Sequence, residues 1–276
     1  MSAHHDWIGR RTLRTEAITD RQISHFRAIL GTLSGPGVVP AGLHWCLMPD
    51  VAESADLGRD GHPRLGLAVP DLGLPRRMWA GGALSFGPPL QPGDSVTRES
   101  TFTDIAFKTG STGQLGFLTV AHEWSVAGKT RITERQDIVY REDPKPGSAV
   151  PPPAADAWVA DRTWTVTPDP VLLFRYSALT FNSHRIHYDH PYATGVEGYG
   201  GLVVHGPLQA TWMLNLATDM LGRLPARFRY RGIAPLICGL SLRIEARAAG
   251  ADIALRVIKD DGVVTMQATA TPEDQP

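Results

Sequence analysis

A run of prolines divides this chain near its midpoint. Residues 141–157 read REDPKPGSAVPPPAADA. Proline lacks the amide hydrogen that a sheet ladder needs and fixes φ, so such a run stays extended and solvated. A length of 276 residues fits one large domain or two ordinary ones. The run therefore predicts an N-terminal unit, 1–141, a linker, 142–157, and a C-terminal unit, 158–276.

The two units show the same order of signals. In the second unit, Gly206 and Pro207 favour the start of a helix over 207–221, which is apolar on most faces and therefore belongs inside. Asp261 and Gly262 predict a hairpin turn between two later segments. A helix followed by strands in each unit predicts a duplicated α+β domain. The β-type segments are 95–107, 114–126 and 130–141 after a helix at 21–33, and 236–248, 252–259 and 263–270 after the helix at 207–221.

Charge and cysteine content exclude several classes of protein. The 27 basic and 28 acidic residues leave a net charge of -1, so bulk electrostatic binding of nucleic acid is not expected. Two cysteines are too few for a disulfide scaffold and match no metal-ligand spacing. With so few cysteines a reducing cytoplasm is expected, and the first residues, MSAHHDWIGRR, hold no apolar core of signal-peptide length. The uncharged stretch 198–218 is broken by glycines in its first half, so it predicts a buried helix and no membrane span.

The densest group of polar functional side chains lies in residues 174–193, FRYSALTFNSHRIHYDHPYA. His184, His187 and His190 recur at intervals of three. A metal site is one interpretation, although a fourth ligand is not evident and the charge of Arg185 opposes a cation. Surface histidines beside a helix cap are the second interpretation. The third is a general acid–base site, because the unperturbed pKa of histidine is about 6.5.

Several short motifs together carry a resemblance to a known family. Residues 182–189, NSHRIHYD, are similar to the hydratase signature of the MaoC-like hotdog family, D-x-N-P-[IL]-H-x-D, with His187 on the catalytic histidine. Residues 204–208, VHGPL, resemble the A-H-G-x-L with which the central helix of that family starts. Other stretches resemble one branch, the HTD2-type (type 2) hydroxyacyl-thioester dehydratases and the mesaconyl-CoA or itaconyl-CoA hydratases. They are DGHP at 60–63, PRRMWAGG at 75–82 and QDIVYRE at 136–142, and the resemblance covers about 20–275.

This resemblance implies a tandem, or double, hotdog fold of the α+β class. Two central helices would each be wrapped by an antiparallel β-sheet, and the two sheets would join. The catalytic motif would lie in the C-terminal hotdog, and the N-terminal hotdog would be degenerate, without a catalytic motif. The implied enzyme is a hydro-lyase that hydrates an enoyl thioester or dehydrates a 3-hydroxyacyl thioester of CoA or acyl carrier protein (ACP), with no metal or organic cofactor. The tandem supplies internally the partner that single hotdogs obtain by dimerising, and further association into a homodimer or higher homo-oligomer is a separate expectation.

The resemblance also implies roles for single residues. His187 would move a proton between water and carbon. The usual aspartate of the signature is Asn182 here, and because an amide cannot accept a proton at neutral pH, Asn182 is expected only to position water. The amide of Gly206 is the candidate donor to the thioester oxygen, with helix capping as the alternative. Substrate contacts are expected from His184, Arg185, Tyr188, His205, Arg76, Arg77, Trp79 and Arg231.

Simpler interpretations stand beside these contacts. The arginines would bind a carrier phosphate or a substrate carboxylate, or they are solvated surface charges. Trp79 also fits the core, and Asp189 fits a helix cap better than a role in orienting a histidine. A hotdog thioesterase is a competing function, disfavoured because the start of the helix at 206 has no carboxylate, and a non-catalytic acyl-CoA-binding module is another. Between fatty acyl substrates and short branched dicarboxylic ones such as mesaconyl-CoA, the arginines favour the acidic class.

Overall fold

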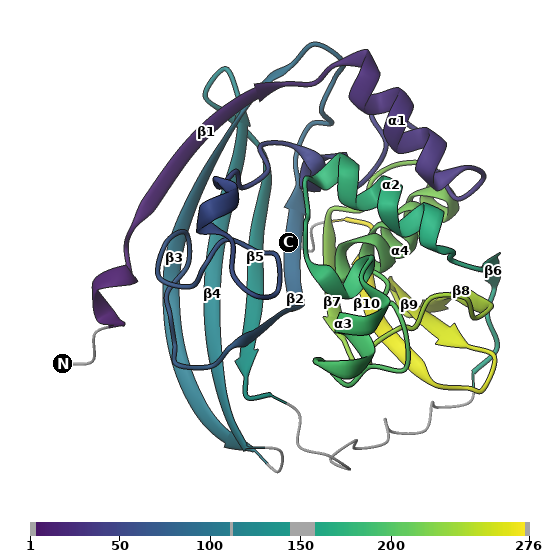
Figure 1. The fold of residues 1–276 in the computed structure, drawn as a ribbon. Coiled ribbons are helices and arrows are strands. Elements are labelled where there is room, and N and C mark those ends of the chain that lie inside the picture. Colours follow the sequence, from purple (N-terminus) through teal and green to yellow (C-terminus); the bar gives the residue numbers. More distant parts are fainter. Residues whose placement is uncertain (1–3, 111–112, 144–157, 274–276) are drawn as a thin grey trace.

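One antiparallel sheet organises the molecule. The structure, a computed structural model, describes residues 4–110, 113–143 and 158–273 (Figure 1). Within them the sheet has ten strands in the order β1-β3-β4-β5-β2-β7-β10-β9-β8-β6. The strands are β1 (Arg11–Ala17), β2 (Arg76–Phe86), β3 (Ser95–Gly110), β4 (Gly113–Val126), β5 (Lys129–Arg141), β6 (Arg162–Val166), β7 (Arg227–Gly232), β8 (Leu242–Ala249), β9 (Asp252–Lys259) and β10 (Val264–Thr271). The helices are α1 (Asp20–Leu30), α2 (Pro170–Thr180), α3 (His190–Gly195) and α4 (Gly206–Leu221).

The strand order repeats on either side of the junction between β2 and β7. Outward from that junction the first half reads β2-β5-β4-β3-β1 and the second half reads β7-β10-β9-β8-β6, which is the same order of connections. At the junction Gly82 lies opposite Tyr230, and a Cβ on Gly82 would come within 2.3 Å of the Tyr230 hydroxyl oxygen. The close approach of the two halves therefore requires a glycine. The predicted tandem hotdog is confirmed, with its two sheets joined edge to edge.

Helix α4 fills the interior of the C-terminal half. Its residues 208–218 are all buried, and the Trp212 side chain is 0% exposed. The helix begins at Gly206 and is followed by Gly222, whose φ of 68° lies in the left-handed region that ends many helices. It packs against β8, β9 and β10 (Figure 1). Because a helix that is apolar on most sides needs such an enclosure, the prediction of a buried helix over 207–221 is confirmed.

The N-terminal half differs from the expected arrangement at its centre. Its helix α1 begins with a capping box between Thr19 and Gln22 and packs against α2. Between α1 and β2 the described chain contains only the short 3-10 turns Leu43–Cys46 and Ser54–Asp56. The structure thus has one long central helix, α4, where the resemblance implies two. The chain between α1 and β2 instead forms loops, and one of them reaches the cavity described below.

Some strands of the structure were not predicted from the sequence. Strands β1, β2, β6 and β7 are absent from the prediction. Strand β8 begins at Leu242 instead of residue 236, because Ile237 pairs with Val203 in an isolated bridge. Most of the predicted linker, 144–157, lies outside the described residues, so the unit boundaries stay predictions. None of the helices in the described part of the chain is long and apolar enough to cross a membrane.

Candidate active site

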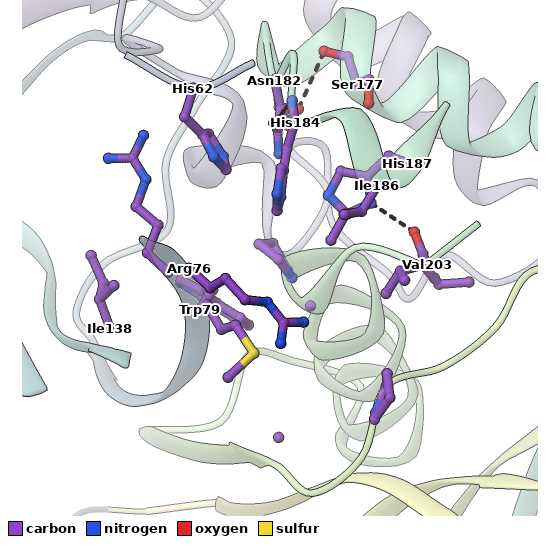
Figure 2. Close-up of a pocket in the computed structure, with 18 of the residues that line it drawn as sticks. His62, Arg76, Trp79, Ile138, Ser177, Asn182, His184, Ile186, His187 and Val203 are labelled. Atoms are coloured by element: carbon purple, nitrogen blue, oxygen red, sulfur yellow. Dashed lines mark hydrogen bonds between the residues drawn. The ribbon is translucent and has the colours of Figure 1, made fainter. Parts of the chain in front are cut away.

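A cavity of about 2060 Å³ is lined by residues of both halves of the molecule. This is about twice the volume at the upper end of ordinary small-molecule pockets, roughly 1,000 Å³. Figure 2 shows His62, His184 and His187 projecting into the cavity, with Arg76 and Trp79 also on its wall. The size suits a long ligand such as an acyl chain on a carrier.

The loop after α2 positions the histidines of the C-terminal half. Phe181 adopts a left-handed conformation with φ 50°, and this turns the chain so that the Asn182 N–H donates to the Ser177 carbonyl at 2.9 Å. The Asn182 Oδ1 accepts the backbone N–H of His184 at 2.9 Å. The Asn182 side chain therefore shapes the loop with its oxygen, and its NH2 group is the part that can serve a ligand.

Asp189 and Arg185 complete the same loop as structural residues. Asp189 is the N-cap of α3, where its Oδ1 accepts the Tyr192 N–H at 3.1 Å. The other oxygen, Oδ2, accepts from Arg185 Nε at 2.9 Å and from its Nη2 at 2.7 Å. The guanidinium also lies over the Tyr192 ring, 4.1 Å from its centroid. Arg185 is thus used within the loop and does not line the cavity, contrary to its predicted contact with substrate.

His187 is held as a neutral imidazole. Its ring is buried, and Nδ1 lies 2.6 Å from the carbonyl oxygen of Val203. Because a carbonyl only accepts, Nδ1 carries the hydrogen and Nε2 keeps a lone pair. Burial lowers the pKa of His187 to about 3, although the bond to Val203 opposes the shift. The ring is therefore uncharged at neutral pH and offers an acceptor.

The His205 ring packs against the ring of His187. The two rings stack with centroids 3.6 Å apart at 18°, and His205 Nε2 lies 2.8 Å from the Ser177 hydroxyl. Burial is the main cause that lowers the pKa of His205 well below its usual value. His205 occupies the N-cap position of α4, but its side chain makes no capping hydrogen bond. It is not among the residues that line the cavity, so the structure gives it a supporting place instead of the predicted substrate contact.

Gly206 is the first residue of α4 and lies on the cavity wall. Its N–H has no acceptor within the helix, and Pro207 beside it has no N–H at all. A Cβ on Gly206 would lie 2.9 Å from Cε3 of Trp79. Trp79 in turn stacks on Tyr230, with ring centroids 4.4 Å apart. Glycine is therefore needed where this tryptophan covers the helix start, and a donor group remains at the positive end of the α4 dipole.

A loop of the N-terminal half brings His62 to the same place. The Asp60 carboxylate accepts both the backbone N–H of His62, at 3.1 Å, and its ring Nδ1, at 3.0 Å. The His62 ring then packs against His184, with centroids 4.2 Å apart, and the rings of His184 and His187 lie at 89° to each other with centroids 5.4 Å apart. Asp60 and His62 were not predicted from the sequence as a site. Its only signal was the DGHP motif at 60–63, which supported the resemblance without receiving a role.

Asp60, His62 and His184 also bring three potential metal-ligating atoms within 4.8 Å of one another. Two features of the group oppose a cation. The Asp60 carboxylate is already hydrogen-bonded to His62. Burial is the largest cause that lowers the pKa of both histidines, and the nearby positive charge of Arg77 lowers it further. The donor set therefore fits a hydrogen-bonded pair of Asp60 and His62 better than a metal site.

The predicted arginine contacts fall into two groups. Arg77 lines the cavity and donates from Nη2 to the Pro63 carbonyl at 2.7 Å, and within the described chain it is not paired with a carboxylate. Arg76 also lines the cavity, but it forms a buried ion pair with Glu197. Arg231 is exposed on β7 and lies outside the cavity lining. Arg77 is thus the predicted arginine that the structure leaves available to a ligand.

The remaining predicted contacts also line the cavity. His184 lies on the cavity wall and is buried. Burial is the largest cause that lowers its pKa far below the usual value, and interactions with neighbouring groups lower it further. Tyr188 is 51% exposed, and its hydroxyl donates to the Ser183 carbonyl at 3.1 Å. Trp79 serves both the core and the cavity wall, as its two interpretations allowed.

Comparisons with known proteins agree with this architecture. The chain is 41% identical over 278 residues to a mesaconyl-C(4)-CoA hydratase of Chloroflexus aurantiacus, covering 95% of each chain. It is 27% identical to a mitochondrial hydroxyacyl-thioester dehydratase type 2 of Schizosaccharomyces pombe, over 74% of this chain and 76% of that one. Among solved structures, HtdX of Mycobacterium tuberculosis matches with a TM-score of 0.68 at 17% identity, over 96% of this chain and 100% of the other. Another protein of that organism, described as having a double hotdog fold, matches with a TM-score of 0.53 at 15% identity, over 96% of both.

The structural matches show the fold, and the sequence matches show the family. The Htd2 family profile, described as hydroxyacyl-thioester dehydratase type 2, matches residues 42–238. This span contains His62 and Asp60 from the first half together with His187 and Gly206 from the second. The chain therefore belongs to the Htd2 family of hydroxyacyl-thioester dehydratases.

Proposed function

We propose that this hydro-lyase adds water to an enoyl thioester at His187 and, in reverse, dehydrates the 3-hydroxyacyl thioester. The observation that carries the proposal is that a neutral His187 and the first N–H of α4, at Gly206, lie on the wall of one cavity. The ring offers an acceptor for a proton of water, and the N–H offers a donor for the thioester oxygen. The names of the two sequence relatives, a hydratase and a dehydratase, describe the two directions of this reaction and support it.

Each group in the cavity would have one task. In hydration, the water oxygen bonds to C3 of the enoyl group while one of its protons passes to His187 Nε2. The electrons of the double bond move toward the thioester carbonyl, whose oxygen accepts a hydrogen bond from the Gly206 N–H. C2 then takes the proton from His187, and this restores the neutral ring. Asn182 holds the water through its NH2 group, because its oxygen is already bonded to His184.

No step of this reaction needs a metal or an organic cofactor, and we propose that the enzyme uses neither. CoA or ACP enters as part of the substrate. A cytoplasmic location and assembly into a homodimer or higher homo-oligomer stay predictions.

A short dicarboxylic enoyl-CoA of the mesaconyl type is the substrate class that we propose. The name of the Chloroflexus relative, 41% identical to this chain, supports that class. Arg77 supplies the physical support, since its guanidinium lies on the cavity wall near His62 and has no carboxylate partner in the described residues. A guanidinium binds a carboxylate with two parallel hydrogen bonds, and an apolar acyl chain cannot use it in this way.

Replacing Arg77 by glutamine is therefore expected to change substrate preference. With mesaconyl-CoA we expect kcat/KM to fall about 100-fold, because a charge-assisted contact is lost. With crotonyl-CoA, which has no free carboxylate, kcat/KM should change less than about threefold. Arg231→Gln, an exposed arginine outside the cavity, is the matched control and should leave both values unchanged. Equal losses with both substrates would contradict a carboxylate contact at Arg77.

One assay distinguishes the hydro-lyase from a thioesterase and from a non-catalytic acyl-CoA-binding module. The protein is incubated with crotonyl-CoA and mesaconyl-CoA while the enoyl absorbance and free thiol are followed together. The hydro-lyase removes the absorbance and releases no thiol. A thioesterase releases thiol, but residues 206–218 of α4 contain no carboxylate to serve it. A binding module would give neither signal, and that result with both substrates would overturn the proposed function.

A further inference from the structure

The proposed chemistry leaves one requirement open at His187. A pKa of about 3 keeps the ring neutral, but it also makes the ring a weak base. An attacking water has two O–H groups, and both need acceptors while its lone pair bonds to carbon. His187 Nε2 provides one acceptor. Asn182, where the broader MaoC-like signature has an aspartate, cannot take a proton, and one of the two lone pairs of its oxygen already accepts the His184 N–H.

The loop that carries His62 is built into the catalytic loop of the other half. The Asp60 carbonyl accepts the Arg185 N–H at 2.8 Å, and the Gly61 carbonyl accepts the Ser183 hydroxyl. A Cβ on Gly61 would lie 2.1 Å from the Ser183 carbonyl oxygen, so only glycine allows the two loops to approach this closely. His62 is therefore fixed relative to His187 by contacts between the two loops.

Asp60 prepares the His62 ring as an acceptor. The carboxylate lies 3.0 Å from Nδ1 and is 13% exposed, against 25% for the His62 side chain. Because a carboxylate only accepts, Nδ1 carries the hydrogen and Nε2 keeps its lone pair. Burial and the charge of Arg77 lower the pKa of His62, while Asp60 opposes that shift. The ring is thus a neutral acceptor with an anion behind it, which stabilises positive charge that develops on the imidazole.

The other acceptors on the cavity wall are less suitable. The Ser177 hydroxyl is bonded to His205, and the Glu197 carboxylate is paired with Arg76. His184 has no carboxylate partner among the described residues, and the charges of its neighbours lower its pKa further. His62 combines a place on the wall, a fixed tautomer and a carboxylate partner that is only 13% exposed.

We propose that His62 is a second catalytic residue, whose Nε2 accepts the second O–H of the attacking water in place of the carboxylate that the broader signature has at position 182. Asp60 is its positioning residue. This inference rests on the proposed function and adds to it that the catalytic site is composite, because the N-terminal half supplies part of the machinery. The expectation of a degenerate first half without a catalytic motif would then be replaced.

The test compares His62→Gln, Asp60→Asn and the double variant with the wild type, using mesaconyl-CoA and crotonyl-CoA. Glutamine keeps hydrogen-bonding groups but has no basic nitrogen, so we expect kcat to fall about 100-fold with KM nearly unchanged. Asp60→Asn should lower kcat about tenfold, since the loop bonds remain and the charge is lost. The double variant should lose no more than His62→Gln alone, because Asp60 acts through His62. His25→Gln, an exposed histidine on α1, is the matched control.

A compensating variant sharpens the test. In His62→Gln with Asn182→Asp, one carboxylate oxygen can keep the bond to the His184 N–H and the other can accept from water. We expect this double variant to regain at least about tenfold in kcat over His62→Gln. Three results would each overturn the role of His62. The first is a wild-type kcat in His62→Gln, and the second is a loss in the His62→Gln and Asp60→Asn double variant equal to the product of the two single losses. The third is no regain of kcat when Asn182→Asp is added to His62→Gln. If His62→Gln disturbs the loop, as a lowered Tm would show, the nearly isosteric Asp60→Asn decides by its kcat. A wild type without hydratase activity would instead reject the proposed function itself.

Discussion

Replacement of His187 by alanine is expected to lower kcat at least about 1,000-fold for any enoyl thioester that the wild type hydrates. General acid–base groups contribute about 10² to 10⁴-fold, and His187 is placed to act twice in the cycle, on water and on C2. Its Nδ1 hydrogen is fixed on the Val203 carbonyl, so alanine removes the acceptor that this bond aims into the cavity. The measurement is kcat from the loss of enoyl absorbance under saturating substrate.

His190→Ala is the matched control for His187→Ala. His190 lies three residues further on, is exposed, and begins α3. Because its side chain lies outside the cavity lining, kcat and KM should stay within about twofold of wild type. Substantial turnover in His187→Ala, with the His190 variant also active, would contradict the proposed mechanism.

The largest effect on stability is expected from Glu197→Gln. Glu197 and Arg76 are 5% and 7% exposed and form a buried ion pair between the loop after α3 and the first residue of β2. The Glu197 carboxylate also accepts the Tyr192 hydroxyl at 3.1 Å, and the Arg76 guanidinium lies 5.3 Å from the centroid of the Tyr199 ring. Removing one charge leaves the other buried and unpaired. We expect the free energy of unfolding to fall by about 3 kcal/mol.

This loss should be seen as a fall in Tm of about 6 °C or more. Glu273→Gln is the matched control, because its pair with Arg223 is exposed and such pairs contribute about 1 kcal/mol or less. A Tm of Glu197→Gln equal to that of the Glu273 variant would show that the buried pair does not hold the two halves together at the cavity.

Much of the fold could be predicted from local patterns. The apolar run over 207–221 identifies α4, and the long β-type segments identify β3, β4 and β5. Burial selects apolar residues at regular positions along such elements, so the sequence itself carries the pattern. Strand β7 alternates charged and aromatic residues but is only six residues long, and β2 contains two glycines, which weaken a strand pattern. Their pairing at the junction depends on the other half of the molecule. No local signal in either strand records that contact.

The site divides in the same way. His187, Asn182 and Gly206 lie within motifs that can be read in one stretch of sequence. The association of His62 with His184 joins positions from two units, and it depends on the Gly61 and Ser183 contact that only the fold creates. The arginines show the converse limit. Arg76 and Arg77 are neighbours with the same chemistry, and only the structure pairs the first with Glu197 and leaves the second on the cavity wall.

One measurement tests the central claim most directly. The enzyme and its His187→Ala variant are incubated with mesaconyl-CoA and crotonyl-CoA in water enriched in heavy oxygen, and the acyl-CoA pool is analysed by mass spectrometry. We expect heavy oxygen in the hydroxyl group of an intact hydroxyacyl-CoA with the wild type, and almost none with the variant. Heavy oxygen in a released carboxylic acid, or equal labelling by both proteins, would contradict hydration at His187.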